Sequence, residues 1–192
     1  MNLLFQGNRY LLKRQVFALT GKFRVYDPGG NLLLFSEQKL FRLREDIRVF
    51  ADEAKTREVL QIKARQIVDF SAAYDVIDSA ANQKAGALRR KGFRSMLRDE
   101  WEVLDVNDNV IGLLYEDNVG LAMLRRLVLG SLLPQNYDIT LGGTRVADLK
   151  QRFNLFAYQL DLDFSMDTGS RLDRRVGIAA GILLAAIEGK QS

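Results

Sequence analysis

The chain has 192 residues with a hydrophobic content of 47%, which favours one domain with a sizeable core. It contains no cysteine and no histidine, which excludes disulfides, thiolate chemistry, Ser-His-Asp catalysis and the commonest metal ligand. Its net charge of +4 suits partners that carry phosphate, although many inert surfaces are as basic.

The N-terminal residues are the first element to interpret. Met1 to Phe5 lacks a charged segment and a long apolar segment, so no signal peptide is predicted and a cytoplasmic location is expected. The run Leu4-Phe5-Gln6-Gly7 looks like a protease-linker scar, and chance explains it equally well. We set residues 1–8 aside as an N-terminal tail that could derive from a tag, and expect a single domain over residues 9–192.

Most of the following chain has the pattern of paired strands, because short alternating runs are separated by turn residues. The first turn is the clearest, since Asp27-Pro28-Gly29-Gly30-Asn31 combines a proline that presets φ with glycines that accept positive φ. The five predicted hairpins span residues 17–38, 47–65, 69–91, 99–116 and 137–149. Three of them place an aromatic residue and an acid before the turn, at Tyr74-Asp75, Trp101-Glu102 and Tyr137-Asp138. This echo predicts a meander of similar hairpins.

One segment breaks the strand pattern. Residues 118–133 predict an amphipathic helix that ends near Gly130 or Pro134. With Arg125-Arg126 in its middle, the helix could lie on a membrane or dock a partner. Two arginines are few for such a surface, so we favour packing against the shell of strands.

The strand after the hairpins has the clearest period of two in the chain. Its predicted inward face is apolar and carries Phe156, Tyr158, Leu160, Leu162 and Phe164. Asp161 and Asp163 lie on the opposite face, where two carboxylates could hold a metal or act as acid and base. Because no third ligand or histidine lies nearby in sequence, we favour a solvated surface without a metal.

The last predicted element is a helix at residues 173–188, around which the rest of the chain is organised. From Val176 to Ile187 it carries no charged or strongly polar residue. This apolar part spans about 18 Å, whereas a bilayer core needs about 20 apolar residues, so it is too short to cross a membrane alone. A helix that is apolar all round must be buried all round. We therefore predict that the strands, about ten or eleven in number, close into a barrel around it.

Small and basic residues give two expectations for this helix. Gly177 and Gly181 have a small-xxx-small spacing, which we expect to let barrel side chains approach the helix closely. Arg171, Arg174 and Arg175 precede the apolar part. They could form a phosphate-facing cluster at the rim of the barrel, but we expect them to stay in water where the helix enters it, with Asp173 as a first-turn acid that offsets their effect on the helix dipole.

Four motifs along the chain carry a family resemblance. They are Tyr10-Leu11-Leu12-Lys13 with Gly21-Lys22-Phe23-Arg24-Val25-Tyr26-Asp27, Tyr74-Asp75-Val76-Ile77-Asp78 with Gly86, Trp101-Glu102-Val103-Leu104-Asp105 with Ile111-Gly112, and Leu160-Asp161-Leu162-Asp163 before the apolar helix. Together they resemble the tubby C-terminal-like superfamily, and within it the LURP-one-related proteins, over residues 9–188. The resemblance implies a mainly β fold, in which a closed antiparallel barrel of twelve strands surrounds a central hydrophobic C-terminal helix.

The ending of the chain, a strand followed by the helix, also resembles the phospholipid scramblases of the same superfamily, which are reported to bind calcium through an acidic segment just before that ending. The comparable residues here, 148–153, contain one acid and two bases. Hard cations require several oxygen ligands, so no calcium site is expected.

The candidate site is a run of bases within residues 84–98, a stretch that contains no acid. The run consists of Lys84, Arg89, Arg90, Lys91, Arg94 and Arg98. As a surface patch it would bind anionic phospholipid headgroups, since each base near a charged membrane adds about 1 kcal/mol of attraction. In the alternative interpretation these bases pair with Asp99, Glu100 and Glu102 on a solvated strand.

These observations lead to two functional hypotheses. The first is a non-catalytic domain without a cofactor, cytoplasmic and peripheral at a membrane, that binds an anionic phospholipid or the membrane surface. The second is a protein-interaction or structural domain without a lipid role. Nucleic-acid binding is not favoured, because no recognition motif accompanies the charge. An enzyme is the least expected, because the usual general base is absent.

Overall fold

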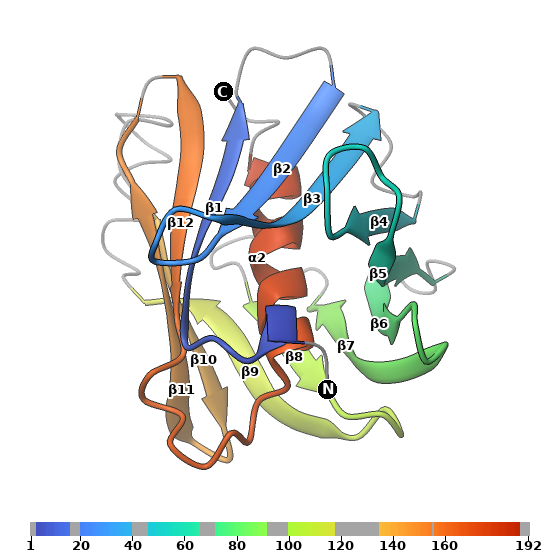
Figure 1. Cartoon of the computed structure of the whole chain (residues 1–192). Helices are drawn as coiled ribbons and strands as arrows, with labels where there is room; N and C mark the ends of the chain where they lie inside the picture. The colour runs from blue at the N-terminus through green and yellow to red at the C-terminus, as the bar shows by residue number, and fades with distance from the viewer. Residues whose placement is uncertain are drawn as a thin grey trace.

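The computed structural model describes seven parts of the chain, which together form one closed barrel (Figure 1). The described residues are 3–15, 20–39, 46–65, 72–91, 100–117, 135–154 and 156–188. The helix predicted at residues 118–133 lies outside them.

Twelve antiparallel strands build the barrel, and each pairs with its neighbours in sequence. The order runs from β1 to β12 without a crossover, and β12 pairs with β1 to close the sheet. The strands are β1 (Arg9–Gln15), β2 (Thr20–Tyr26), β3 (Leu32–Lys39), β4 (Ile47–Phe50), β5 (Glu58–Ala64), β6 (Ala73–Asp78), β7 (Gln83–Arg90), β8 (Glu100–Leu104), β9 (Val110–Glu116), β10 (Asn136–Leu141), β11 (Thr144–Arg152) and β12 (Ala157–Asp163). The predicted twelve-stranded barrel is confirmed.

The barrel has two unlike ends, because the connections of a meander alternate between them. At one end, the turn rim, short turns join β2 to β3, β4 to β5, β6 to β7, β8 to β9 and β10 to β11. The five predicted hairpins are these five pairs. At the other end, the loop rim, strands β1, β3, β5, β7, β9 and β11 finish.

Strand β1 is the element that the hairpin pattern missed. Its buried side chains are Tyr10, Leu12 and Arg14, and the arginine interrupts the apolar alternation that marks a core-facing strand. Arg14 is only 3% exposed, and its Nη1 donates a hydrogen bond to the carbonyl oxygen of Ala185 at 2.9 Å. A cation at the C-terminal end of a helix is favourable for the helix dipole, so the buried charge has a partner in the bore.

Helix α2 (Arg174–Glu188) fills the bore, where Figure 1 shows it in red inside the ring of strands. No side chain from Val176 to Ala186 is more than 6% exposed. The predicted central helix is therefore confirmed. A Cβ added to Gly177 would lie 2.5 Å from Cε1 of Phe164, and one added to Gly181 would lie 2.9 Å from Cδ2 of Leu162. The two glycines thus allow close packing, as the sequence predicts.

The start of α2 is tied to the barrel by polar contacts. Asp173 caps the helix, since its Oδ1 accepts a hydrogen bond from the backbone N–H of Arg175 at 2.9 Å. Arg174 is 5% exposed, and its Nη1 donates to Oδ2 of Asp167 at 2.8 Å. The expectation that Arg174 stays in water is wrong, because the segment after β12 folds back and buries a carboxylate beside it. Arg171 is exposed, as expected.

The N-terminal residues lie at the turn rim, beside the start of α2. They form a short 3₁₀ turn, η1 (Leu3–Phe5), and Phe5 is 1% exposed within the core. The phenol of Tyr10 donates a hydrogen bond to the carbonyl oxygen of Leu4 at 3.3 Å. Leu4 and Phe5, which were set aside with the tail on sequence grounds, therefore pack against the core of the domain.

Replacing Phe5 by alanine is expected to lower the free energy of unfolding by about 2–3 kcal/mol. The value is low for a buried phenylalanine because a segment near the chain end can relax around the missing ring. Chemical denaturation measures it, with Leu3→Ala as the control. Leu3 is 81% exposed, so its replacement should change stability by less than about 0.5 kcal/mol. Equal effects of the two changes would contradict a structural role for Phe5.

Strand β12 has the predicted alternation with one exception. Tyr158, Leu160 and Leu162 are buried, and so is Phe164 just after the strand. Phe156 is instead 74% exposed, so its predicted inward position is wrong. The strand begins only at the following residue, because the chain makes a turn before it.

The outer face of β12 carries the two paired carboxylates of the sequence analysis. Asp161 forms an ion pair with Arg152, at 2.6 Å between Oδ2 and Nε, and Asp163 forms one with Arg9 at 3.0 Å. Among the described residues, no group of three or more acidic side chains lies close enough to hold a metal ion. The two aspartates act as partners of neighbouring strands on the solvated wall.

Candidate functional site

Four of the six candidate bases lie in the described part of the chain, on or next to β7. Lys84, Arg89 and Lys91 project from the outer wall of the barrel, where each forms an ion pair. Arg90 faces the interior, opposite the buried Trp101, and its guanidinium lies 6.0 Å from the centre of that ring. Alternation along a strand therefore divides the run between two faces. Arg94 and Arg98 lie outside the described residues.

The pairing of Arg89 and Lys91 follows from strand register. Arg89 lies directly opposite Glu102 on β8, with 2.5 Å between Nη2 and Oε2. Lys91 pairs with Glu100, with 2.5 Å between Nζ and Oε1. The alternative interpretation, in which the bases pair with the acids of the next strand, is thus confirmed for Glu100 and Glu102. Asp99, the third acid named there, lies outside the described residues.

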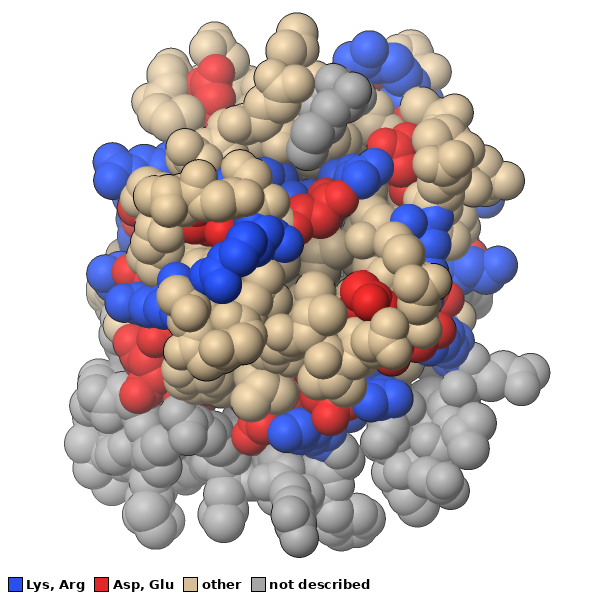
Figure 2. All heavy atoms as spheres, turned by 90° about the horizontal axis from the view of Figure 1, so that it is seen from below, with Lys and Arg blue, Asp and Glu red and all other residues tan. Residues whose placement is uncertain are grey.

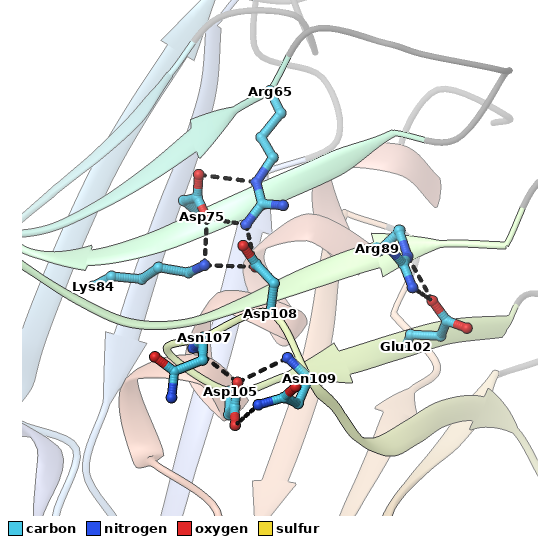
Figure 3. Close-up of polar contacts among 9 residues, drawn as sticks. All are labelled: Arg65, Asp75, Lys84, Arg89, Glu102, Asp105, Asn107, Asp108 and Asn109. Atoms are coloured by element: carbon cyan, nitrogen blue, oxygen red, sulfur yellow. Dashed lines mark hydrogen bonds and ion pairs between the residues drawn. The ribbon is translucent and has the colours of Figure 1, made fainter.

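Lys84 belongs to a network of four charges that spans three hairpins (Figure 3). A shift of register between Val76 and Ile77 in the pairing of β6 with β7 accompanies the outward position of Lys84. Its Nζ lies 3.3 Å from Asp75 and 2.6 Å from Asp108. Arg65 contacts the same two carboxylates, each at 2.5 Å. Two cations are therefore matched by two carboxylates.

Hydrogen bonding holds the charged forms of this network. Burial alone would raise the pKa of Asp75, but the hydrogen bond and the charge of Arg65, together with Lys84, keep that pKa below its ordinary value. Hydrogen bonds from Arg65 and Lys84 likewise lower the pKa of Asp108. The pKa of Arg65 is raised, first by its hydrogen bond with Asp75. The carboxylates of Asp75 and Asp108 are therefore ionised at neutral pH.

The β8–β9 turn brings Asp108 to this position. The carboxylate of Asp105 accepts hydrogen bonds from the backbone N–H groups of Asn107 and Asn109 and from the Asn109 side chain, at 2.8–2.9 Å (Figure 3). Asp108 itself has φ of 68°, a left-handed conformation that aspartate tolerates in turns. Sequence analysis recognised the turn but not its contact with β7, because the contact depends on the fold of two hairpins.

The described part of the chain as a whole is balanced in the same way. The described residues contain 21 Lys and Arg and 21 Asp and Glu, so they carry no net charge. In Figure 2 basic and acidic side chains lie next to one another over the face shown, without a large area of one sign. The net charge of +4 therefore comes from residues outside the described parts, which include Arg94 and Arg98.

The twelve-stranded meander and the buried C-terminal helix agree with the architecture that the family resemblance implies. A model of the LURP-one-related family matches residues 32–185, from β3 to the last turns of α2. The chain belongs to the LURP-one-related family. A search of curated proteins finds no match to this LURP-one-related domain.

A second group of cations on the LURP-one-related domain was not predicted. It lies on β1 and β11, which flank β12, and in each ion pair the cation is more exposed than its acid. The side chain of Lys150 is 59% exposed and that of its partner Asp148 is 10% exposed. The same order holds for Arg9 with Asp163, Arg145 with Asp148 and Arg152 with Asp161. These bases are dispersed in sequence, so no local pattern indicated them.

Proposed function

We propose that this LURP-one-related domain is a non-catalytic binding domain that associates with the surface of membranes containing anionic phospholipids. The observation that carries the proposal is the filled bore. Because α2 occupies it with buried apolar side chains, a ligand must be bound on the outside of the barrel. Within the described residues, no helix has the length and apolar content needed to cross a bilayer.

Two features of the outer surface support an anionic ligand. The cations of β1 and β11 extend beyond the acids that they pair with, so ammonium and guanidinium groups form the outermost layer of that wall. In addition, the net charge of the chain is positive. The base run at residues 84–98 supports the proposal less, because the side chains of its described outward members are 24–40% exposed, compared with 59% for Lys150 and 55% for Arg152.

Co-sedimentation of the full chain with vesicles tests the proposal. We expect binding to phosphatidylcholine vesicles that contain phosphatidylserine or a phosphoinositide, and weaker binding to phosphatidylcholine alone. Raising the salt concentration should reduce binding, because exposed charges are screened beyond about 10 Å at 0.1 M salt. Absence of binding to any of these vesicles at low salt would rule the proposal out.

Two double variants compare the contributions of the β11 cations and the β7 cations to vesicle binding in the same assay. Lys150→Gln/Arg152→Gln should weaken binding about three- to tenfold, since each base contributes up to about 1 kcal/mol and both already have partners. Arg89→Gln/Lys91→Gln should change it by less than about twofold if the balanced wall of β7 stays away from the membrane. The opposite order would assign binding to the run at residues 84–98.

The alternative function, a protein-interaction domain without lipid binding, also has an observation in its favour. Val106, Val110 and Ile111 are 37–52% exposed at the β8–β9 turn, and exposed apolar side chains gather at protein interfaces. This alternative predicts that the chain binds no vesicles, whatever their lipid composition. It also predicts that Val106→Ser/Val110→Ser, rather than a change of cations, abolishes a complex seen by cross-linking and light scattering.

A further inference from the structure

The turn between β11 and β12 exposes two aromatic rings. Phe153 is 59% exposed and Phe156 is 74% exposed. The other described phenylalanines are buried or half-buried, as expected for this residue type. Two exposed rings within one short turn therefore require an explanation other than the average composition of a protein surface.

Hydrogen bonds from Phe156 and Ala157 to Asn154 hold the backbone where β12 begins. The side-chain Oδ1 of Asn154 accepts hydrogen bonds from the N–H groups of Phe156 and Ala157, at 2.9 and 3.0 Å. The pairing of β11 with β12 extends towards the turn as far as Arg152 and Gln159. These hydrogen bonds hold the described backbone around Phe156, so little conformational freedom has to be lost there when its ring contacts a partner.

Two exposed cations precede the two rings in the chain. Lys150 and Arg152 precede the turn, with side chains 59% and 55% exposed, whereas their partners Asp148 and Asp161 are 10% and 36% exposed. Lys13 on β1 lies in the same row of the sheet as Arg152, with Gln159 between them. The exposed acid near this group is Asp117, which acts on Lys150 through its charge. The outermost charges next to the rings are therefore mainly positive.

We propose that the β11–β12 turn is the part of the domain that enters a membrane. Phe153 and Phe156 insert into the interfacial layer of the bilayer, and Lys150 and Arg152 meet the phosphate groups of the lipids. Rings that protrude from a convex turn suit a fluid interface, which needs no preformed pocket, and flanking bases strengthen such binding. This inference rests on the proposed function and adds the contact surface and the mode of binding.

Vesicle binding of two double variants tests the inference. Phe153→Ser/Phe156→Ser should weaken binding of the full chain to phosphatidylcholine–phosphatidylserine vesicles by about tenfold or more. The matched control is Val106→Ser/Val110→Ser, which also removes two exposed apolar side chains but from the opposite rim. The control should bind as the unchanged protein does. Thermal unfolding should be nearly the same for all three, because the replaced side chains are exposed.

A fluorescence measurement gives a second readout at the same position. In Phe156→Trp, emission should shift to the blue on vesicle addition and be quenched by brominated lipids. The natural Trp101 is 2% exposed and should contribute a constant background. If vesicles bind the serine variant as well as the unchanged protein, and no quenching occurs, the inference is wrong while the proposed function stands. If the unchanged protein binds no vesicles, both fail.

Discussion

Replacing Asp167 by alanine is expected to lower the free energy of unfolding by about 3–5 kcal/mol, because it leaves the buried Arg174 without its partner. The carboxylate of Asp167 is fully buried and accepts hydrogen bonds from Nη1 of Arg174 and from the N–H groups of Arg171 and Leu172. Losing them releases both the turn before α2 and the start of the helix. Urea denaturation at neutral pH measures the change.

The matched control is Asp161→Ala, which breaks an ion pair on the outer wall. Both members of that pair are exposed by more than a third, so its loss should cost less than about 1 kcal/mol. If the two variants are equally stable, the start of α2 is not locked by Asp167. A comparable loss from Arg174→Met would add support, since it leaves the other charge buried and unpaired.

The pH dependence of stability gives an independent check on Asp167. Burial would raise its pKa, but the hydrogen bonds from Arg174 and the backbone outweigh that effect and place the pKa below the ordinary value of an aspartate. Its contribution is therefore present above the ordinary aspartate pKa of about 3.9 and is lost as the pH falls through the lower pKa of the folded state. The stability difference between the unchanged protein and Asp167→Asn should accordingly shrink with acidification. A constant difference from pH 7 to pH 2 would contradict this.

Replacing Gly112 by alanine is expected to cost at least about 3 kcal/mol, at the upper end for overpacking, because the obstacle is backbone. A Cβ at this position would lie 2.0 Å from the carbonyl oxygen of Thr140 and 2.6 Å from Cδ2 of Leu141. Gly112 pairs with Leu141 in the β9–β10 ladder, so the two strands would have to separate. Denaturation midpoints and the yield of soluble protein measure the effect.

Gly142→Ala serves as the comparison, because it lies in the adjacent β10–β11 turn. A Cβ there meets no atom within 4 Å, and only the φ of 54° opposes the change. Its cost should be about 1 kcal/mol, typical of a left-handed position. Equal costs at the two glycines would mean that conformation, rather than the approach of β9 to β10, explains why residue 112 is glycine.

Those features that depend on the chemistry of a single segment could be predicted from the sequence. The uninterrupted apolar run of α2 predicts a helix that is buried on all sides. The five hairpins could be placed because turn residues such as Pro28 and Gly142 separate alternating strands. The role of Gly177 and Gly181 followed from their spacing once burial of the helix was assumed.

Those features that depend on two distant segments could not be predicted. β1 was missed because Arg14 faces inward, and its partner Ala185 lies at the other end of the chain. The burial of Arg174 depends on Asp167, whose position is set by the turn after β12. In both cases a charge appears at an interior position, and only the folded chain shows which group compensates it.

The candidate site illustrates the same limit. The run at residues 84–98 is basic when read along the chain, but a strand presents alternate residues to opposite faces and faces the acids of its neighbours. Strand register places Arg89 opposite Glu102. The ion pair of Lys84 with Asp108 depends instead on the position of the β8–β9 turn. The exposure of Phe156 was missed for a related reason, since one residue of strand boundary decides whether the ring points in or out.

The seam between β1 and β12 means that the first strand to leave the ribosome must wait for the last. Until residues 157–163 have been synthesised, β1 has one unpaired edge. Until α2 has also been synthesised, the nascent sheet lacks the apolar helix around which the barrel closes. Pairing of the first and last strands of the barrel requires slow loop closure, and incomplete chains with open edges aggregate readily. Chains truncated before α2 should therefore be insoluble, rather than fold into smaller domains.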